Sequence, residues 1–218
     1  MTEVSASILT VEKDNATQMF YDLEVAKINY FHIDVMDGKF VERDTTSTMK
    51  DYALTISHIS NLGLDVHLMV ENVEEFMDEY LMLEPEILTF HIEATKTEER
   101  TKNIIEQIKD NGTRVGISIS PDTDLEAIKP YLSQIHMVLV MTVVPGKGGQ
   151  KLIPETLDKV RELKNYIDEN GLDIDIEVDG GINKETAELA KEAGANILVA
   201  GNYLITAENL KEAVQSLK

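Results

Sequence analysis

The most constraining feature of this sequence is the recurrence of short apolar runs, rich in β-branched residues, between longer amphipathic stretches. Such runs predict buried parallel strands, and the stretches between them predict helices. The predicted strands are Val4–Leu9, Tyr30–Val35, Leu64–Val70, Ile87–His91, Arg114–Ile119, Met137–Thr142, Ile174–Val178 and Ile197–Ala200. Eight strand–helix units in 218 residues favour a closed (β/α)8 TIM barrel, with an open doubly wound α/β sheet as the alternative.

No linker, repeat or low-complexity segment divides the chain, so residues 1–218 are predicted to form a single barrel domain. The predicted helices include Val73–Leu83, Thr97–Asn111, Leu125–Leu132, Ile153–Asn170, Lys184–Ala193 and Ala207–Leu217. Asn-Gly pairs at Asn111 and Asn170 predict left-handed helix ends, and Asn183 and Thr206 are predicted N-caps.

The charge balance argues against nucleic-acid and anionic-membrane partners. The chain carries 40 acidic and 20 basic residues, a net charge of −20, which repels polyanions. No apolar run approaches the length of a membrane span, and the N-terminus lacks the pattern of a signal peptide, so a cytoplasmic location is predicted. There is no cysteine, which excludes disulfides, thiolate nucleophiles and Cys-based zinc sites.

Charged residues inside or at the ends of the apolar runs are the candidates for chemistry, because buried parallel strands disfavour charge. His32 and Asp34 lie two apart on one strand face, His67 lies late in the next strand, and Asp179 ends a later one. In a barrel these strand ends converge on one mouth. Two imidazoles and two carboxylates suit one divalent metal per chain, with zinc, iron, manganese and cobalt all admissible. The other histidines, His58, His91 and His136, are interpreted as structural.

Glycine-rich turns follow three of the predicted strands and predict a phosphate-binding site. Barrels commonly bind phosphate between the loops after strands seven and eight, where backbone N–H groups are exposed. Gly180, Gly181, Gly201 and Asn202 occupy these positions, and Gly146, Lys147, Gly148 and Gly149 follow the sixth strand. Lys147 would add a positive charge to the pocket.

Four motifs, taken in order along the chain, resemble the ribulose-phosphate 3-epimerase family from Ser7 to Gly201. They are His32-Ile33-Asp34-Val35-Met36-Asp37-Gly38, Asp65-Val66-His67-Leu68-Met69-Val70, Pro145-Gly146 with Gly148-Gly149-Gln150, and Glu177-Val178-Asp179-Gly180-Gly181. The resemblance implies a (β/α)8 barrel whose metal is held by the four residues above, with His67 also near the substrate. It further implies that Ser7 positions the substrate, that Met36, Met69 and Met141 pack beside the reacting carbons, and that the chain forms a homo-oligomer.

The implied reaction explains why two carboxylates are needed. Inverting the carbinol centre C3 beside a ketone removes a proton on one face and returns one on the other, so D-ribulose 5-phosphate and D-xylulose 5-phosphate interconvert through an enediolate. Asp34 and Asp179 are the predicted pair of bases, and the direction each serves stays open. An isomerase of the pentose phosphate pathway that acts on a phosphorylated ketose is therefore expected.

Departures from the family pattern gather in the loops above the barrel mouth, where barrels change specificity. Glu42-Arg43 replaces the usual Pro-Asn, Ser120 replaces Asn before proline, Val144 and Lys147 replace Asn and Phe, and Asn202 replaces Ser. An epimerase for a related ketose phosphate such as D-allulose 6-phosphate is one alternative, and a non-catalytic barrel that binds sugar phosphates or a partner protein is another. A decarboxylase or hexulose-phosphate synthase is disfavoured, because no Asp-x-Lys-x-x-Asp motif is present.

Overall fold

The computed structural model describes residues 2–218, and Met1 of the predicted domain lies outside the described residues. Eight parallel strands close into a barrel in which each strand pairs with its neighbours in chain order and β8 pairs with β1. The strands are β1 (Glu3–Ser7), β2 (Tyr30–Met36), β3 (Gly63–Met69), β4 (Ile87–His91), β5 (Arg114–Ile119), β6 (Met137–Met141), β7 (Asp175–Asp179) and β8 (Ile197–Ala200). The predicted (β/α)8 barrel is confirmed, and the open sheet is excluded.

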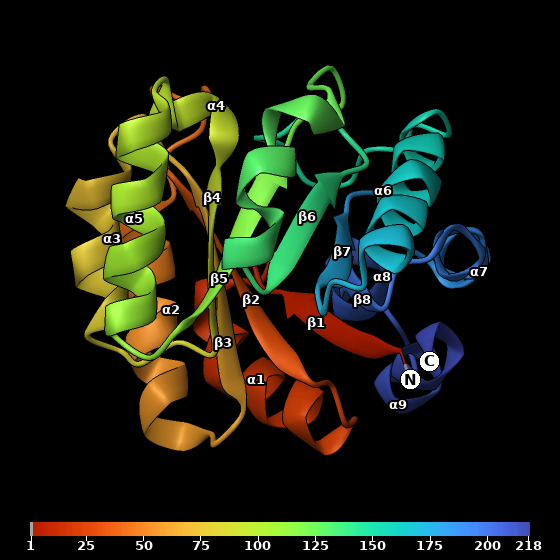
Figure 1. Ribbon diagram of the computed structural model, residues 1–218. Coiled ribbons are helices and arrows are strands. Elements are labelled where there is room, and N and C mark those ends of the chain that lie inside the picture. The colour runs from red at the N-terminus through yellow and green to blue at the C-terminus, as the bar shows by residue number, and fades with distance from the viewer. Residues whose placement is uncertain (1) are drawn as a thin grey trace.

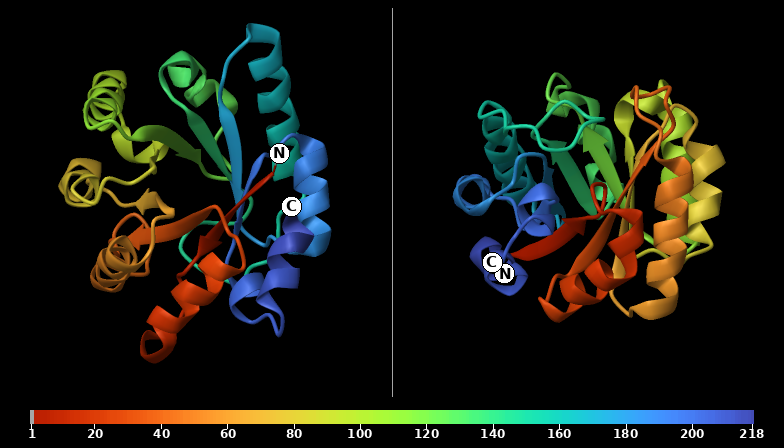
Figure 2. Two further views of the ribbon diagram at one scale, coloured as in Figure 1. Left: turned by 90° about the horizontal axis from the view of Figure 1, so that it is seen from below. Right: turned by 180° about the vertical axis from the view of Figure 1, so that it is seen from behind.

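Helices surround the strands, as Figure 2 shows from two further directions. The α-helices are α1 (Ala16–Val25), α2 (Thr46–Ile59), α3 (Val73–Leu81), α4 (Ile92–Thr95), α5 (Glu98–Asp110), α6 (Thr156–Asn170), α7 (Lys184–Ala193), α8 (Asn202–Ile205) and α9 (Leu210–Leu217). The beginning of β1 and the end of α9 lie close together (Figure 1). None of the helices within residues 2–218 is both long and apolar enough to cross a lipid bilayer.

The main core lies between the barrel and its helices, which explains why the strands read as continuous apolar runs. Phe20, Phe31 and Phe90 are among its fully buried residues. A smaller cluster that includes Leu139, Met141 and Ile197 fills part of the barrel interior. The remaining interior is polar, and its fully buried groups include His32, Asp65, His67, His91 and Glu177. Polar residues facing inward on parallel strands carry a desolvation cost, so they mark the site.

One predicted helix is wrong in type. The segment Leu125–Leu132 forms two 3-10 helices, η2 (Leu125–Ala127) and η3 (Lys129–Gln134), because Pro130 lies in the first turn of η3. Proline lacks the N–H that an α-helix through this point requires, and its ring clashes with the preceding turn.

Three of the predicted helix ends are confirmed and one is wrong. Gly112 and Gly171 adopt positive φ after α5 and α6, as predicted, and Asn183 caps α7 in a reciprocal capping box with Thr186. Thr206 is not an N-cap: it follows the short helix α8, and α9 begins later with the Asn209 side chain as its cap. The first predicted strand also ends early, at Ser7.

Candidate active site

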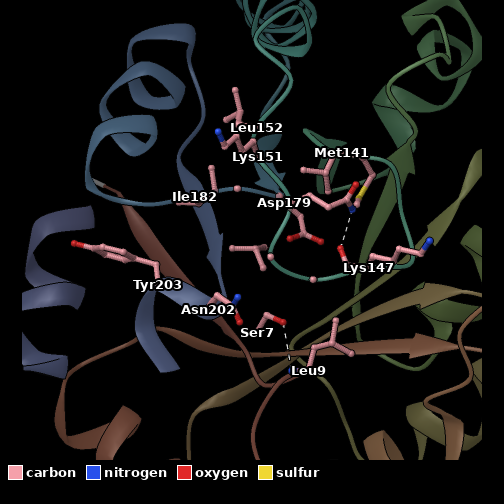
Figure 3. A pocket seen from close by; sticks show the side chains of 18 of the residues that line it. Ser7, Leu9, Met141, Lys147, Lys151, Leu152, Asp179, Ile182, Asn202 and Tyr203 are labelled. Atoms are coloured by element: carbon pink, nitrogen blue, oxygen red, sulfur yellow. Dashed lines mark hydrogen bonds between the residues drawn. The ribbon is translucent and has the colours of Figure 1, made fainter. Parts of the chain in front are cut away.

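A cavity of about 670 Å³ opens at the carboxyl ends of the strands. Figure 3 shows side chains facing it from the strand ends, among them Ser7, Met141 and Asp179, and Asn202 from the beginning of α8. Twelve of the thirteen predicted substrate-binding residues line this cavity: Ser7, Met36, Met69, Met141, Gly146, Lys147, Gly148, Gly149, Gly180, Gly181, Gly201 and Asn202. His67 is the exception, because its side chain is fully buried and does not line the cavity.

The four predicted metal ligands meet at the base of the cavity. His32 and Asp34 come from β2, His67 from β3 and Asp179 from the end of β7, and one ligand atom of each lies within 4.8 Å of all the others. Asp34 Oδ1 lies 3.4 Å from His32 Nε2 and 3.6 Å from His67 Nδ1. Asp179 Oδ2 lies 3.9 Å and 3.8 Å from the same two nitrogens. All four nitrogen–oxygen distances are longer than those of ordinary hydrogen bonds.

The donor set fits a divalent metal. His32 Nε2 and His67 Nδ1 are buried and make no hydrogen bond to any described residue. Buried polar atoms are normally satisfied, so two unpartnered nitrogens aimed at two carboxylates form a set of ligand atoms that a cation would satisfy. Two ligand atoms that are each about 2.1 Å from a tetrahedral metal lie about 3.4 Å apart, close to the spacing found here.

A buried carboxylate holds the other nitrogen of His32. Asp65 Oδ2 lies 2.6 Å from His32 Nδ1 and accepts a hydrogen bond of 2.6 Å from the Ser5 hydroxyl. Burial opposes ionisation of Asp65, but the His32 ring outweighs it and lowers the pKa of Asp65. Glu177 belongs to the same cluster, and burial beside the Asp65 charge raises its pKa well above the ordinary value, which favours the protonated form of this carboxyl group.

The other nitrogen of His67 faces a second buried histidine. His67 Nε2 lies 3.0 Å from His91 Nε2, and His91 Nδ1 lies 3.0 Å from Glu93 Oε2. His91, interpreted as structural from the sequence, is thus in contact with a candidate ligand. His58 and His136 lie apart from the site: His58 is exposed on α2, and His136 accepts a hydrogen bond from the backbone of Val115.

The pKa values of the two aspartates at the cavity floor are shifted in opposite directions. Burial opposes ionisation of Asp34, but His32 and His67 outweigh it and hold the pKa of Asp34 well below its ordinary value. Burial and the Asp34 charge raise the pKa of Asp179 to about 7. The Ser7 hydroxyl donates to Asp34 Oδ2 at 2.7 Å, which orients that carboxylate. Neighbouring carboxyl groups with separated pKa values are a common arrangement for proton transfer.

The two imidazoles also differ. Burial opposes a charged His32 ring, but Asp65 and Asp34 raise the pKa of His32 well above its ordinary value. A metal would therefore bind there by displacing a proton. Burial lowers the pKa of His67 to about 4, so this ring is neutral and able to present a lone pair.

The turn after β7 needs glycine twice. Gly180 has φ +125° and a Cβ there would lie 2.4 Å from Val143 Cγ2. Gly181 has φ +67° and a Cβ would lie 2.3 Å from the backbone nitrogen of Leu152. Only glycine tolerates both the conformation and the close approach, so this loop brings bare backbone to the cavity wall.

The divergent loop residues lie at the rim. Lys147 extends away from the cavity centre in Figure 3, and its ammonium group lies 3.9 Å from Glu42 Oε2. Both side chains are largely exposed. Val144 is also exposed, whereas the Ser120 N–H donates to Glu93 Oε1 at 2.8 Å. The positive charge predicted for the pocket from Lys147 is thus directed towards the β2–α2 loop.

Together these features define a barrel enzyme with a buried histidine–aspartate centre beneath a glycine-lined cavity. Residues 3–205 match the model of the ribulose-phosphate 3 epimerase family. The chain belongs to this family of isomerases, as the resemblance of its four motifs predicted.

Named relatives agree over the full length of the chain. The chain is 42% identical to a ribulose-phosphate 3-epimerase of Methanocaldococcus jannaschii over 218 residues, which cover 100% of this chain and 90% of the relative. It is 38% identical to the enzyme of the same name from Bacillus subtilis, over 100% of this chain and 99% of the relative. The epimerase class of enzyme is therefore established.

Solved structures with low sequence identity share the fold. A 3-keto-L-gulonate-6-phosphate decarboxylase from Vibrio cholerae superposes with a TM-score of 0.74 at 13% identity, covering 99% of this chain and 95% of that one. A 3-hexulose-6-phosphate synthase from Salmonella typhimurium has a TM-score of 0.73 at 13% identity, with coverage of 99% and 96%. At this identity the likeness shows the barrel alone.

Proposed function

We propose that the chain interconverts D-ribulose 5-phosphate and D-xylulose 5-phosphate by metal-dependent, two-base proton transfer at C3. The observation that carries this proposal is the meeting of two unpartnered histidine nitrogens and two aspartates at the floor of the cavity. The names of the full-length relatives support the choice of substrate pair. The whole barrel would act as one catalytic domain.

The proposed metal ligands are His32, Asp34, His67 and Asp179, holding one divalent zinc, iron, manganese or cobalt ion. Bound there, the metal would act as a Lewis acid that stabilises negative charge developing on the substrate oxygens. His32 and His67 would contribute neutral nitrogens, each kept in orientation by its outer partner, Asp65 or His91.

Asp34 and Asp179 are the proposed catalytic residues. They enter the floor from β2 and β7, on different sides of the barrel, and both line the cavity. One carboxylate would take the C3 proton while the other, in its protonated form, returns a proton to the opposite face. The opposite displacements of their pKa values favour this division, and the return reaction exchanges the roles.

The remaining wall would bind the rest of the substrate. Backbone groups at Gly180, Gly181, Gly201 and Asn202 are proposed to bind the phosphate, together with the loop from Gly146 to Gly149. The methionines Met36, Met69 and Met141 would provide an apolar wall beside the reacting carbons, and Ser7 would position substrate near Asp34. Self-association, implied by the family resemblance, and a cytoplasmic location, inferred from the sequence, remain predictions.

Proton exchange tests this proposal directly. Ribulose 5-phosphate and allulose 6-phosphate are incubated separately with the enzyme in deuterated water, and NMR follows loss of the C3 proton while metal content is measured on the same sample. We expect exchange and xylulose 5-phosphate from the pentulose. Exchange with the hexulose alone would transfer the assignment to allulose 6-phosphate, and a sample without metal or exchange would support a sugar-phosphate-binding barrel.

Two variants test the roles of the bases. Asp34→Asn and Asp179→Asn should each lower turnover by at least about 100-fold, the usual contribution of a general acid or base. Asp173→Asn is the matched control, because Asp173 is exposed at the opposite end of the barrel, just before β7. Normal turnover in both floor variants would rule out the two-base mechanism.

A further inference from the structure

A largely buried chain of hydrogen bonds leads away from His67 Nε2, the ring nitrogen that does not face Asp34 and Asp179. His67 Nε2 and His91 Nε2 lie 3.0 Å apart, and His91 Nδ1 lies 3.0 Å from Glu93 Oε2. The two imidazole rings are stacked, and Phe40 packs on the His91 ring. None of His91, Glu93 and Phe40 lines the cavity, so this chain reaches the site only through His67.

Glu93 determines which nitrogen of each imidazole ring is the hydrogen-bond donor. Glu93 Oε1 accepts hydrogen bonds from the Ser120 N–H and from the Thr123 hydroxyl. Burial opposes ionisation of Glu93, but these contacts and His91 outweigh it and lower its pKa to about 2. An ionised carboxylate only accepts, so His91 Nδ1 must donate to Oε2.

The rest of the chain follows from the chemistry of imidazole. A neutral ring has one donor and one acceptor nitrogen, so a His91 ring that donates from Nδ1 accepts at Nε2. His67 Nε2 must then carry the proton that it donates to His91. This leaves the lone pair of His67 on Nδ1, the unpartnered atom that faces Asp34 and Asp179.

When both rings are neutral, the opposite arrangement is excluded by distance. With the proton on His67 Nδ1, the lone pairs of a neutral His91 Nδ1 and of Glu93 Oε2 would then face each other at 3.0 Å, a hydrogen-bond distance. In the arrangement derived above, the lone pair of His67 Nδ1 faces Asp34 Oδ1 at 3.6 Å, where no hydrogen bond is required.

We propose that Glu93 and His91 are positioning residues that fix the tautomer of His67 so that its Nδ1 is free to bind the metal. This inference rests on the proposed metal centre and adds two residues to it, neither of which touches the cavity. Histidine ligands are commonly held through their second nitrogen, and loss of such a partner costs about 10- to 100-fold in metal affinity.

An isosteric substitution should reverse the direction of each hydrogen bond between Glu93 and His67 while keeping the contacts themselves. In Glu93→Gln the amide oxygen must stay at the Oε1 position, because the backbone N–H of Ser120 can only donate. The amide NH2 then faces His91 Nδ1 and donates to it. His91 Nε2 becomes the donor, His67 Nε2 the acceptor, and the His67 proton moves to Nδ1, where it blocks the metal.

The test combines a spectroscopic measurement with metal affinity. Nitrogen-15 NMR of the imidazoles is recorded on the metal-stripped full chain at about pH 8.5, where an ordinary histidine is neutral. Only five histidines are present, which makes assignment practicable. We expect protons on His67 Nε2 and His91 Nδ1 in the wild type, and on His67 Nδ1 and His91 Nε2 in Glu93→Gln. Zinc affinity, measured by competition with a chelator, should fall about 10- to 100-fold in the variant.

Thr123→Val is the matched control. It removes one hydrogen bond to Glu93 but leaves an ionised carboxylate opposite His91, so tautomers and zinc affinity should stay as in the wild type. Equal losses in Thr123→Val and Glu93→Gln would show a merely structural role and overturn the proposal. Unchanged tautomers and affinity in Glu93→Gln would also overturn it, while the metal centre itself would stand. A wild-type chain that binds no zinc, iron, manganese or cobalt would instead refute the proposed function.

Discussion

The Asp65→Asn substitution tests how strongly the buried carboxylate supports the proposed metal centre. Asp65 is fully buried, and its Oδ2 lies 2.6 Å from His32 Nδ1 and 2.6 Å from the Ser5 hydroxyl. An asparagine oxygen at the same place keeps both contacts but loses the charge. Hydrogen bonds to charged groups contribute about 1.5–3 kcal/mol against about 0.5–1.5 kcal/mol for neutral ones, so the midpoints of the two ranges give a loss of about 1.25 kcal/mol.

That loss corresponds to about a tenfold weaker affinity for the metal. The assay is competition between the protein and a chromophoric chelator for zinc at fixed pH, with circular dichroism to confirm that the variant is folded. At saturating metal, turnover should fall only a few-fold, because Asp65 does not line the cavity.

Ser5→Ala provides the control, since it removes the other partner of Asp65 and leaves the carboxylate on His32. Its metal affinity should stay within about threefold of the wild type, because the Asp65 charge opposite His32 Nδ1 is kept. If Asp65→Asn also bound zinc as tightly as the wild type, the Asp65 charge would contribute nothing and the reasoning from the 2.6 Å contact would be refuted.

Two further predictions concern the interior and the loops. The pKa of Glu177 is raised in the folded chain, so folding takes up a proton and the free energy of unfolding falls as pH rises. Glu177→Gln should therefore gain in melting temperature relative to the metal-stripped wild type as pH rises above the ordinary glutamate pKa of 4.5, and a constant difference would contradict this. Gly181→Ala, which forces a Cβ to 2.3 Å from Leu152 N, should destabilise the chain by more than about 2 kcal/mol in denaturant unfolding. Gly148→Ala, whose Cβ would meet Thr10 Cγ2 at an ordinary 3.5 Å, should change stability by less than about 0.5 kcal/mol, and equal effects would refute the steric argument.

The barrel could be predicted from sequence because parallel strands covered by helices must be apolar on both faces. Three strands, including Ile87–His91 and Ile197–Ala200, have the predicted bounds. The segment around Pro130 could not be assigned from periodicity, because its apolar spacing fits a helix while proline excludes the α-helical hydrogen bond. Thr206 failed as a predicted cap because Asn209 offers the same chemistry three residues later.

The candidate ligands could be found from sequence because each is a charged or polar residue near the end of an apolar strand. His32 and Asp34 lie two residues apart on β2, His67 lies late in β3, and Asp179 ends β7. Asp65 carried the same signal, since it lies two residues before His67 as His32 lies before Asp34, and β2 pairs it directly with His32. His91 and Glu93 gave a weaker signal. Glu93 belongs to the first turn of α4, beyond the end of β4, and nothing in the sequence indicates that it bends back towards a strand residue.

The residues that depart from the family pattern are of two kinds: one contributes its backbone to the site, and the others contribute their side chains. Ser120 serves Glu93 through its backbone N–H, which every residue except proline supplies, so the exchange of its side chain leaves that contact intact. Glu42 and Lys147 contribute exposed side chains that pair with each other across the rim. Exposed ion pairs contribute about 0–1 kcal/mol, so this pair does little for stability. Substitution in these two loops is therefore expected to change what the rim admits and to leave the proposed proton-transfer floor as it is, which would let one barrel centre serve ketose phosphates of different length.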